Sequence, residues 1–222
     1  TLGVVGLGAI GSMIANLALE LGMDVIGYDP AISVEAAWQL SSNVERMDSI
    51  EALLSRADFV TLHVPAIPAT KHLINSKTLS VMKSSAKILN FAREEIVSTA
   101  DMVEALEKGV IGGYVTDFPT PELLGRKEVL LMPHIGASTA EAEENCAVMA
   151  ANQLMDFLEN GNICNSVNYP HIKMARNGGT RITFTNKNVP KVLGNVLSIL
   201  ADSNLNVVDM VNKSRDEIAY NI

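Results

Sequence analysis

The first eleven residues constrain the fold more than any other stretch of the chain. They form a short apolar segment, a turn with Gly6, Gly8 and Gly11 in the G-x-G-x-x-G spacing, and the start of a helix. The first glycine permits a tight turn, the second lets a diphosphate approach the backbone, and the third allows close helix–strand packing. The helix that begins near Ile10 directs unpaired N–H groups and the positive end of its dipole toward the diphosphate. The pattern predicts a dinucleotide site.

An acidic residue in the second predicted strand supports this reading. Asp29 ends the apolar stretch 23–29 and follows Gly11 by close to the ~20 residues expected of the carboxylate that binds the adenosine ribose. A carboxylate there repels a 2′-phosphate, and no arginine follows it directly, so NAD is favoured over NADP. A glycine turn alone also occurs in strand–helix units that bind no ligand, and it is the combination with Asp29 that predicts an NAD site.

Strand and helix patterns then alternate up to about residue 133. We expect strands at 25–28, 57–64, 86–92, 112–117 and 129–133, and helices at 10–21, 33–40, 48–54, 76–82 and 98–108. Asp48 is expected to cap the helix that follows it. This rhythm predicts an α/β fold, a doubly wound parallel (Rossmann) sheet with helices on both faces. Loops beyond the carboxyl ends of its strands should line the ligand crevice.

The remainder of the chain has a different pattern. A long helix is expected from Thr139 to about Glu159, ended by Gly161, and then a linker over 162–179. A β-α-β-β tail follows, with expected strands at 181–185, 205–211 and 218–222 and a helix at 190–202. We therefore expect a dinucleotide-binding domain at 1–140, a helix and linker at 141–179, and a partial α+β domain at 180–222. The chain is expected to be cut at both ends.

Composition excludes several classes of function. The net charge of −8 offers no general basic face for nucleic acid. Cys146 and Cys164 lack metal-type spacing, so we expect reduced structural thiols and no metal. There is no uninterrupted apolar run of about 18 residues. These observations lead us to expect a cytoplasmic protein.

Three side chains that can carry chemistry follow predicted strands. They are Arg93, Glu122 and His134. Hydride exchange between a nicotinamide and a carbinol carbon needs a proton carrier, and imidazole suits neutral pH. A carboxylate can orient the ring, and an arginine can bind a substrate carboxylate through two parallel hydrogen bonds. Singly, the same residues could be a surface charge, a solvated loop acid and a structural histidine.

Four segments make the sequence resemble the D-isomer-specific 2-hydroxyacid dehydrogenases. The segments are 6–11, 62–65, 90–97 and 133–139, and the tail 181–222 resembles the ACT regulatory domain that many of these enzymes carry. The resemblance implies that Arg93 holds the substrate carboxylate, that His134 takes the hydroxyl proton, and that a glutamate partners His134. It also implies cofactor contacts at Gly8, Ala9, Ile10, Asp29, Val64, Pro65, Thr70, Ala92, Asp117, His134 and Gly136.

Three departures from the family pattern bear on the site. Counting from Asp117 places the expected glutamate at Glu122, whereas an alignment on 118–119 puts Pro121 at the catalytic place. We take Glu122 as the partner of His134. Glu94 stands where a glycine is common after the arginine. The family's N-terminal substrate region does not precede Thr1, so the contacts to a substrate phosphate are not identified.

The resemblance of the tail to an ACT domain bears on which related activity is expected. It favours 3-phosphoglycerate, oxidised by NAD in the first step of serine biosynthesis, over other hydroxy acids. The resemblance also implies a homo-oligomer, and serine as a possible effector near Asn186, Asn188 and Asn206. Two alternatives stay open. One is a hydroxypyruvate or glyoxylate reductase of the same family, and the other is a non-catalytic NAD-binding regulatory protein.

Overall fold

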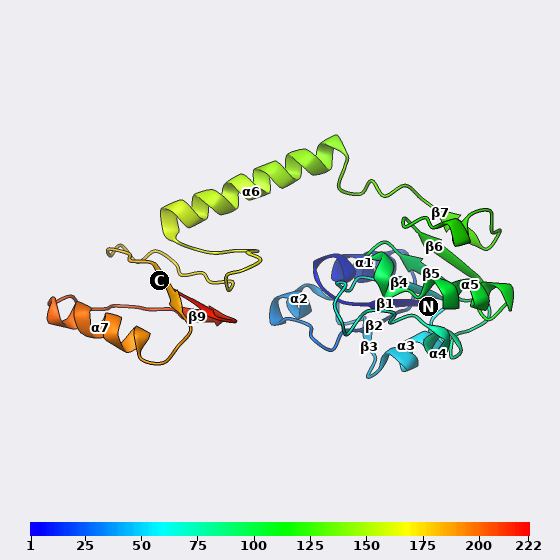
Figure 1. The fold of residues 1–222 in the computed structure, drawn as a ribbon, viewed down its shortest axis with the longest axis horizontal. Coiled ribbons are helices and arrows are strands. Elements are labelled where there is room, and N and C mark those ends of the chain that lie inside the picture. The colour runs from blue at the N-terminus through cyan, green and yellow to red at the C-terminus, as the bar shows by residue number, and fades with distance from the viewer. The chain divides into compact units, whose positions relative to one another are not determined.

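The structure is a computed structural model that describes residues 1–222, apart from the side chain at position 35. It divides into two compact units, Thr1–His134 and Ile135–Ile222. Figure 1 labels the helices and strands in chain order. The two units are described separately. No helix among the described residues is both long enough and apolar enough to cross a membrane.

The first unit is built on a sheet in which all seven described strands run parallel. Their spatial order is β3-β2-β1-β4-β5-β6-β7, so the order reverses between β1 and β4. The predicted doubly wound parallel sheet is confirmed, and ligands bind such sheets at the point of reversal. The strands are β1 (Leu2–Val5), β2 (Val25–Tyr28), β3 (Glu45–Arg46), β4 (Phe59–Leu62), β5 (Lys87–Asn90), β6 (Gly113–Thr116) and β7 (Val129–Leu131).

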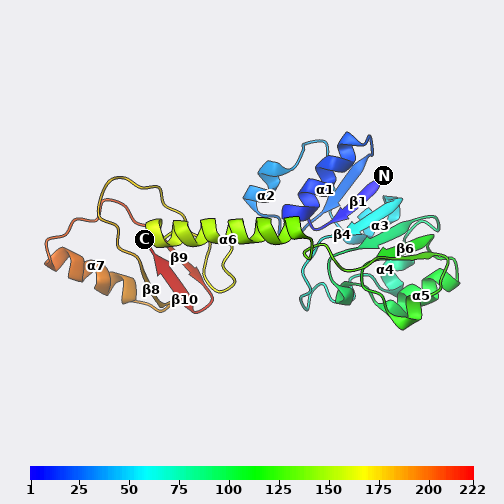
Figure 2. The same ribbon diagram turned by 90° about the horizontal axis from the view of Figure 1, so that it is seen from above.

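Helices cover both faces of this sheet because successive strand side chains point to opposite faces. Leu2 and Val4 of β1 pack in a cluster with α1, whereas the neighbouring Val5 packs in a larger cluster with α3, α4 and α5. Figure 2 shows the strands running between these helices. The helical elements are α1 (Ala9–Glu20), α2 (Val34–Gln39), α3 (Ile50–Arg56), α4 (Ser76–Leu79), α5 (Thr99–Glu107), and the 3₁₀ turns η1 (Glu94–Ile96) and η2 (Pro121–Leu123).

The start of α3 corrects one expectation. Ser49 is the N-cap, and its hydroxyl accepts a hydrogen bond from the Ala52 N–H at 3.1 Å. The prediction that Asp48 caps this helix was wrong by one residue. The capping side chain must reach the third backbone N–H of the helix, and only the residue directly before Ile50 is placed to do so.

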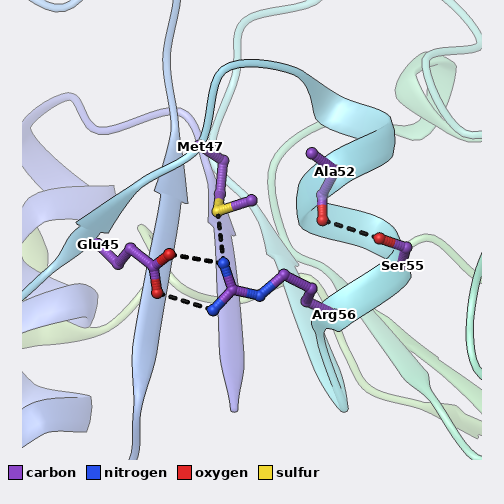
Figure 3. A network of polar contacts seen from close by, with 5 residues as sticks. All are labelled: Glu45, Met47, Ala52, Ser55 and Arg56. Carbon is purple, nitrogen blue, oxygen red and sulfur yellow. Dashed lines mark hydrogen bonds and ion pairs between the residues drawn. The ribbon is translucent and has the colours of Figure 1, made fainter.

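The two-residue strand β3 was absent from the predicted elements. It lies at the edge of the sheet, and α3 is fastened to it by a bidentate ion pair (Figure 3). Arg56 Nη1 and Nη2 lie 2.6 and 2.8 Å from the Glu45 carboxylate oxygens, and Nη1 lies 3.5 Å from the sulfur of Met47. A pairing this short leaves no periodic pattern in the sequence from which to predict a strand.

The second unit contains α6 (Ala140–Asn160), β8 (Phe184–Lys187), α7 (Val192–Asp202), β9 (Asn212–Arg215) and β10 (Ile218–Asn221). Its sheet has the order β8-β10-β9, and β10 is antiparallel to both neighbours. The two strands joined through α7 therefore run parallel with a third strand between them. This is the arrangement of a split β-α-β unit.

Three details of this unit differ from expectation. The prediction of a strand at 205–211 was wrong, because β9 begins at Asn212 and only Val211 extends the pairing, by exchanging backbone hydrogen bonds with Ile222. β8 starts three residues later than predicted (184 − 181 = 3). The expected linker 162–179 contains a bridge between Ile163 and Ile172. Both isoleucines are buried in a cluster with residues of β10. Part of this segment therefore packs as core of the second unit.

Candidate active site

The glycine turn after β1 is shaped by two close approaches. Gly6 has a φ of +89°, and a Cβ on it would lie 2.5 Å from the carbonyl oxygen of His63. A Cβ on Gly11 would lie 1.9 Å from the carbonyl oxygen of Gly6. Larger residues would push the turn away from β4 or push α1 away from the turn. The fold itself therefore requires these two glycines.

Gly8 differs from both, because no described heavy atom lies within 4 Å of the place its Cβ would take. It is the N-cap of α1, and no side chain caps that helix. Gly8, Ala9 and Ile10 are all exposed. The first N–H groups of α1 therefore face open space, where the helix dipole favours an anion.

Asp29, at the end of β2, is tied to the glycine turn. Its Oδ2 accepts a hydrogen bond from the Leu7 N–H at 2.8 Å, and its Oδ1 accepts one from the Ala31 N–H at 2.8 Å. Each carboxylate oxygen retains a further lone pair. Asp29 is only partly buried, so these lone pairs can accept hydrogen bonds from ribose hydroxyls.

The loop after β4 lies across the point of strand reversal from the glycine turn. The hydroxyl of Thr70 donates to the Pro65 carbonyl at 2.5 Å and accepts from the Ile67 N–H at 3.0 Å, which closes the loop on itself. Val64 is partly buried and Pro65 is exposed. His63 Nε2 lies 2.9 Å from the Thr61 hydroxyl, and burial lowers the pKa of His63. The ring is therefore favoured in its neutral form.

Arg93 follows β5 and is exposed. Its Nη1 donates to the carbonyl of Ala92 at 2.6 Å, and Arg93 takes part in none of the ion pairs among the described residues. The guanidinium is therefore available to an anion. The fully buried Asn90 holds the loop beneath it, accepting from the Ala92 N–H at 3.2 Å and donating to the Arg93 carbonyl at 2.9 Å.

His134 contacts a carboxylate, and that carboxylate belongs to Asp117. Nδ1 of His134 lies 3.1 Å from Oδ2 of Asp117, and the Phe118 ring lies 5.0 Å from the imidazole between centroids. The Asp117 side chain is 13% exposed and that of His134 is 56% exposed. Oδ1 of Asp117 is buried and has no hydrogen-bond partner among the described atoms.

Glu122 lies on the exposed turn η2. A hydrogen bond from its own backbone N–H lowers the pKa of its carboxyl, which is therefore ionised at neutral pH. No hydrogen bond or ion pair joins it to His134 in the described structure. The pairing of His134 with Glu122 stays a prediction. Gly136 lies in the second unit, and its cofactor contact also stays a prediction.

Sequence reasoning missed two features of this region. It proposed Asp117 for the cofactor only, whereas the structure also places its carboxylate on His134. It gave no role to Asn90. One signal was available, because Asn90 is a polar residue that ends an apolar strand directly before the loop that carries Arg93.

The described residues fit a dinucleotide along the carboxyl edge of the sheet. The open space beside Gly8 and the exposed N–H groups of α1 fit a diphosphate. Asp29 fits a ribose diol. The unpartnered, buried Oδ1 of Asp117 needs a donor such as an amide NH₂. No group of three or more potential metal ligands occurs among the described side chains.

Comparison with known proteins agrees with this geometry. Residues 1–136 match the family described as D-isomer specific 2-hydroxyacid dehydrogenase, NAD binding domain. The chain belongs to this family. NAD is therefore the cofactor of the first unit, as the glycine turn and Asp29 predicted.

Two curated relatives align with nearly the whole chain. In an alignment 246 residues long, the chain is 35% identical to a putative D-3-phosphoglycerate dehydrogenase of Schizosaccharomyces pombe. This alignment covers 99% of this chain and 51% of the relative. It is 35% identical over 231 residues to the D-3-phosphoglycerate dehydrogenase of Haemophilus influenzae, covering 99% of this chain and 55% of the relative. The chain thus spans about half the length of these curated relatives.

The fold is similar to that of a solved structure of a protein whose name is that of the same family. The NAD-complexed D-isomer specific 2-hydroxyacid dehydrogenase of Lactobacillus delbrueckii ssp. bulgaricus matches with a TM-score of 0.65 and 28% identity. The match covers 75% of this chain and 56% of that one.

Proposed function

We propose that this chain forms the NAD-binding part of a D-3-phosphoglycerate dehydrogenase, which oxidises 3-phospho-D-glycerate to 3-phosphohydroxypyruvate in the first step of L-serine biosynthesis. One observation carries the choice of substrate. The similarity to two D-3-phosphoglycerate dehydrogenases extends over 99% of the chain, including the tail beyond the NAD-binding domain. The geometry of the first unit supports the chemistry, because Arg93 and the Asp117–His134 pair follow the carboxyl ends of β5, β6 and β7.

Each proposed catalytic side chain has a task set by its surroundings. NAD, when bound, supplies the acceptor for the hydride that leaves the carbinol carbon. The guanidinium of Arg93 binds the substrate carboxylate with two parallel hydrogen bonds. His134 donates its Nδ1–H to Asp117, so Nε2 carries the lone pair that accepts the hydroxyl proton. The imidazole is more than half exposed, so Nε2 is accessible to a substrate.

Two carboxylates are candidates for the partner of His134. Asp117 makes the contact in the structure, whereas Glu122 is the partner that the family pattern implies. Asp117 also has a free buried oxygen that suits the cofactor. We propose that Asp117 orients His134 in the free enzyme and that Glu122 can replace it when the cofactor engages Asp117.

For the second unit we propose an ACT-like regulatory role with serine as effector, in a homo-oligomer. The order β8-β10-β9 supports a module of this kind. Among the three expected polar residues, Asn186 and Asn188 already bond within the unit, to Asn221 and to the carbonyl of Asp216. Asn206 lines a cavity of about 450 Å³, so it is the best placed of the three to meet an effector. We retain the proposed domain division at 1–140, 141–179 and 180–222.

The test is NADH production by the full-length protein with 3-phosphoglycerate, D-glycerate and D-lactate. We expect kcat/KM for the phosphorylated acid to exceed the others by roughly 10⁴-fold, as for a site built to bind a particular polar group. Faster reduction of hydroxypyruvate or glyoxylate would favour the reductase alternative. NAD binding without turnover of any acid would favour the non-catalytic regulator. Serine added to the same assay tests the effector.

A further inference from the structure

Two polar side chains at the carboxyl edge of the sheet are fully buried. Asn90 ends β5 and Thr116 ends β6, both are 0% exposed, and they are register partners. A buried polar group is costly unless its hydrogen bonds are made. Here both side chains bond to the backbone of the loop that follows their own strand. The Thr116 hydroxyl accepts from the Phe118 N–H at 3.1 Å, beside Asp117.

Asn90 uses both ends of its amide on the loop that carries Arg93. Its Oδ1 accepts from the Ala92 N–H at 3.2 Å, and its Nδ2 donates to the Arg93 carbonyl at 2.9 Å. The same Nδ2 lies 3.4 Å from the hydroxyl of the buried Tyr114 on β6. The amide is therefore held from the sheet side, and on the loop side it fixes the N–H of one residue and the carbonyl of the next.

The position of Arg93 depends on the contacts of its backbone more than on those of its side chain. Its guanidinium is exposed and bonds only to the carbonyl of the preceding residue among its described contacts. The backbone of Arg93 therefore determines which positions the guanidinium can take. That backbone is anchored by Asn90 and by a long contact from the Ile96 N–H to the Arg93 carbonyl at 3.4 Å.

We propose that Asn90 is a positioning residue that places Arg93 for the substrate carboxylate. This inference rests on the proposed function, because Arg93 must bind that carboxylate. Loss of the Asn90 amide frees the Ala92 N–H and leaves the Arg93 carbonyl with only the long contact from the Ile96 N–H, and the arginine then samples several positions. Misplacement by about 1 Å is enough to cost on the order of 100-fold in rate. The glycine turn belongs to a different loop, so binding of the NAD diphosphate there should persist.

The experiment compares Asn90→Ala with Asn75→Ala in the full-length protein. Asn75 is a matched control, because its side chain also bonds to backbone groups on either side, at His72, Lys77 and Thr78, but not to the Arg93 loop. We expect Asn90→Ala to lower kcat/KM for 3-phosphoglycerate about tenfold to a hundredfold, mainly through KM. The Kd for NADH should change less than kcat/KM does in Asn90→Ala, because the glycine turn is unaltered and only the expected contact at Ala92 lies on this loop, and it should stay unchanged in Asn75→Ala.

A double-mutant cycle separates positioning from a merely structural role. If Asn90 acts through Arg93, adding Asn90→Ala to Arg93→Ala should have little further effect on kcat/KM. An equal loss in both backgrounds would overturn the proposal, and so would unchanged kinetics of Asn90→Ala. Asn90→Asp keeps the acceptor for the Ala92 N–H and removes the donor to the Arg93 carbonyl, and it serves if the alanine variant does not fold.

A second readout does not depend on turnover. Amide hydrogen exchange of Ala92 should accelerate about tenfold or more in Asn90→Ala and stay unchanged in Asn75→Ala, because the Ala92 N–H loses its acceptor only in the first variant. Unchanged exchange at Ala92 would contradict the positioning role. If the wild-type protein turned over no acid while Ala92 exchange still accelerated, the proposed function would fail and the support of this loop by Asn90 would stand.

Discussion

Replacing Gly8 by alanine should separate cofactor binding from folding. Its φ and ψ of −70° and −161° are open to alanine, and no described heavy atom lies within 4 Å of the new Cβ. Alanine is a poorer N-cap than glycine by about 0.5–1 kcal/mol. The reduced entropy of the unfolded chain returns about 0.4–1 kcal/mol. We therefore expect the free energy of unfolding to change by less than about 1 kcal/mol.

Cofactor affinity should fall much more than stability does. The methyl group enters the space in which a diphosphate must approach the first N–H groups of α1. Losing one hydrogen bond from a backbone N–H to a charged oxygen costs about 1.5–3 kcal/mol. With 1.4 kcal/mol for each factor of ten, the Kd for NADH should rise by about 10- to 150-fold.

The assay is NADH titration by fluorescence, beside thermal unfolding, on the full-length wild type and the Gly8→Ala variant. Ser49→Ala is the matched control, because loss of the α3 cap should cost about 1 kcal/mol of stability and leave NADH affinity unchanged. Wild-type affinity in Gly8→Ala would refute the placement of the diphosphate. A large loss of stability in that variant would refute the reading of Gly8 as open.

Three further predictions concern other parts of the first unit. Burial lowers the pKa of His63 from 6.5, so the unfolded chain binds more protons there and the free energy of unfolding should fall as the pH drops below 6.5. His63→Gln should reduce this pH dependence, measured by urea unfolding. A pH dependence equal to that of the wild type would contradict the prediction. The hydrogen bond from Arg56 lowers the pKa of Glu45, so the pair should stabilise the fold at pH values above the usual pKa of a glutamate and lose this effect as the pH falls. Arg56→Met should lower the free energy of unfolding at pH 7 and hardly change it near pH 3. An equal loss at both pH values would count against the prediction. We propose that Glu122 partners His134 once the cofactor engages Asp117, so Glu122→Gln should lower kcat at saturating NAD more than Asp117→Asn does. The reverse order would assign that task to Asp117.

Local patterns predicted most of the first unit. The apolar strands that become β1, β2, β4, β5 and β6 are bounded by glycine, proline or polar residues, so periodicity alone placed them within a few residues. The pattern failed where structure depends on a partner. β3 is an edge strand that pairs with β2 alone and contacts Arg56 through Glu45, and residues 205–210 have strand-like composition but lie in no strand. β-propensity depends on such context.

For the candidate site, the sequence predicted which residues gather at one edge but not how they pair. Arg93, Asp117 and His134 each follow a strand, and parallel strands bring such residues to the same edge. Whether His134 meets Asp117 or Glu122 depends on how the loop after β6 folds, which no local pattern specifies. The role of Asn90 depends likewise on its register with Thr116 and on the path of the following loop.

The most direct measurement is turnover of 3-phosphoglycerate by a full-length His134→Gln variant, with its NADH affinity measured alongside. General acid–base catalysis contributes about 10²- to 10⁴-fold, so NADH production at saturating NAD should fall by that factor. Wild-type turnover in this variant would contradict the assignment of His134 as the base, and with it the proposed chemistry of the site.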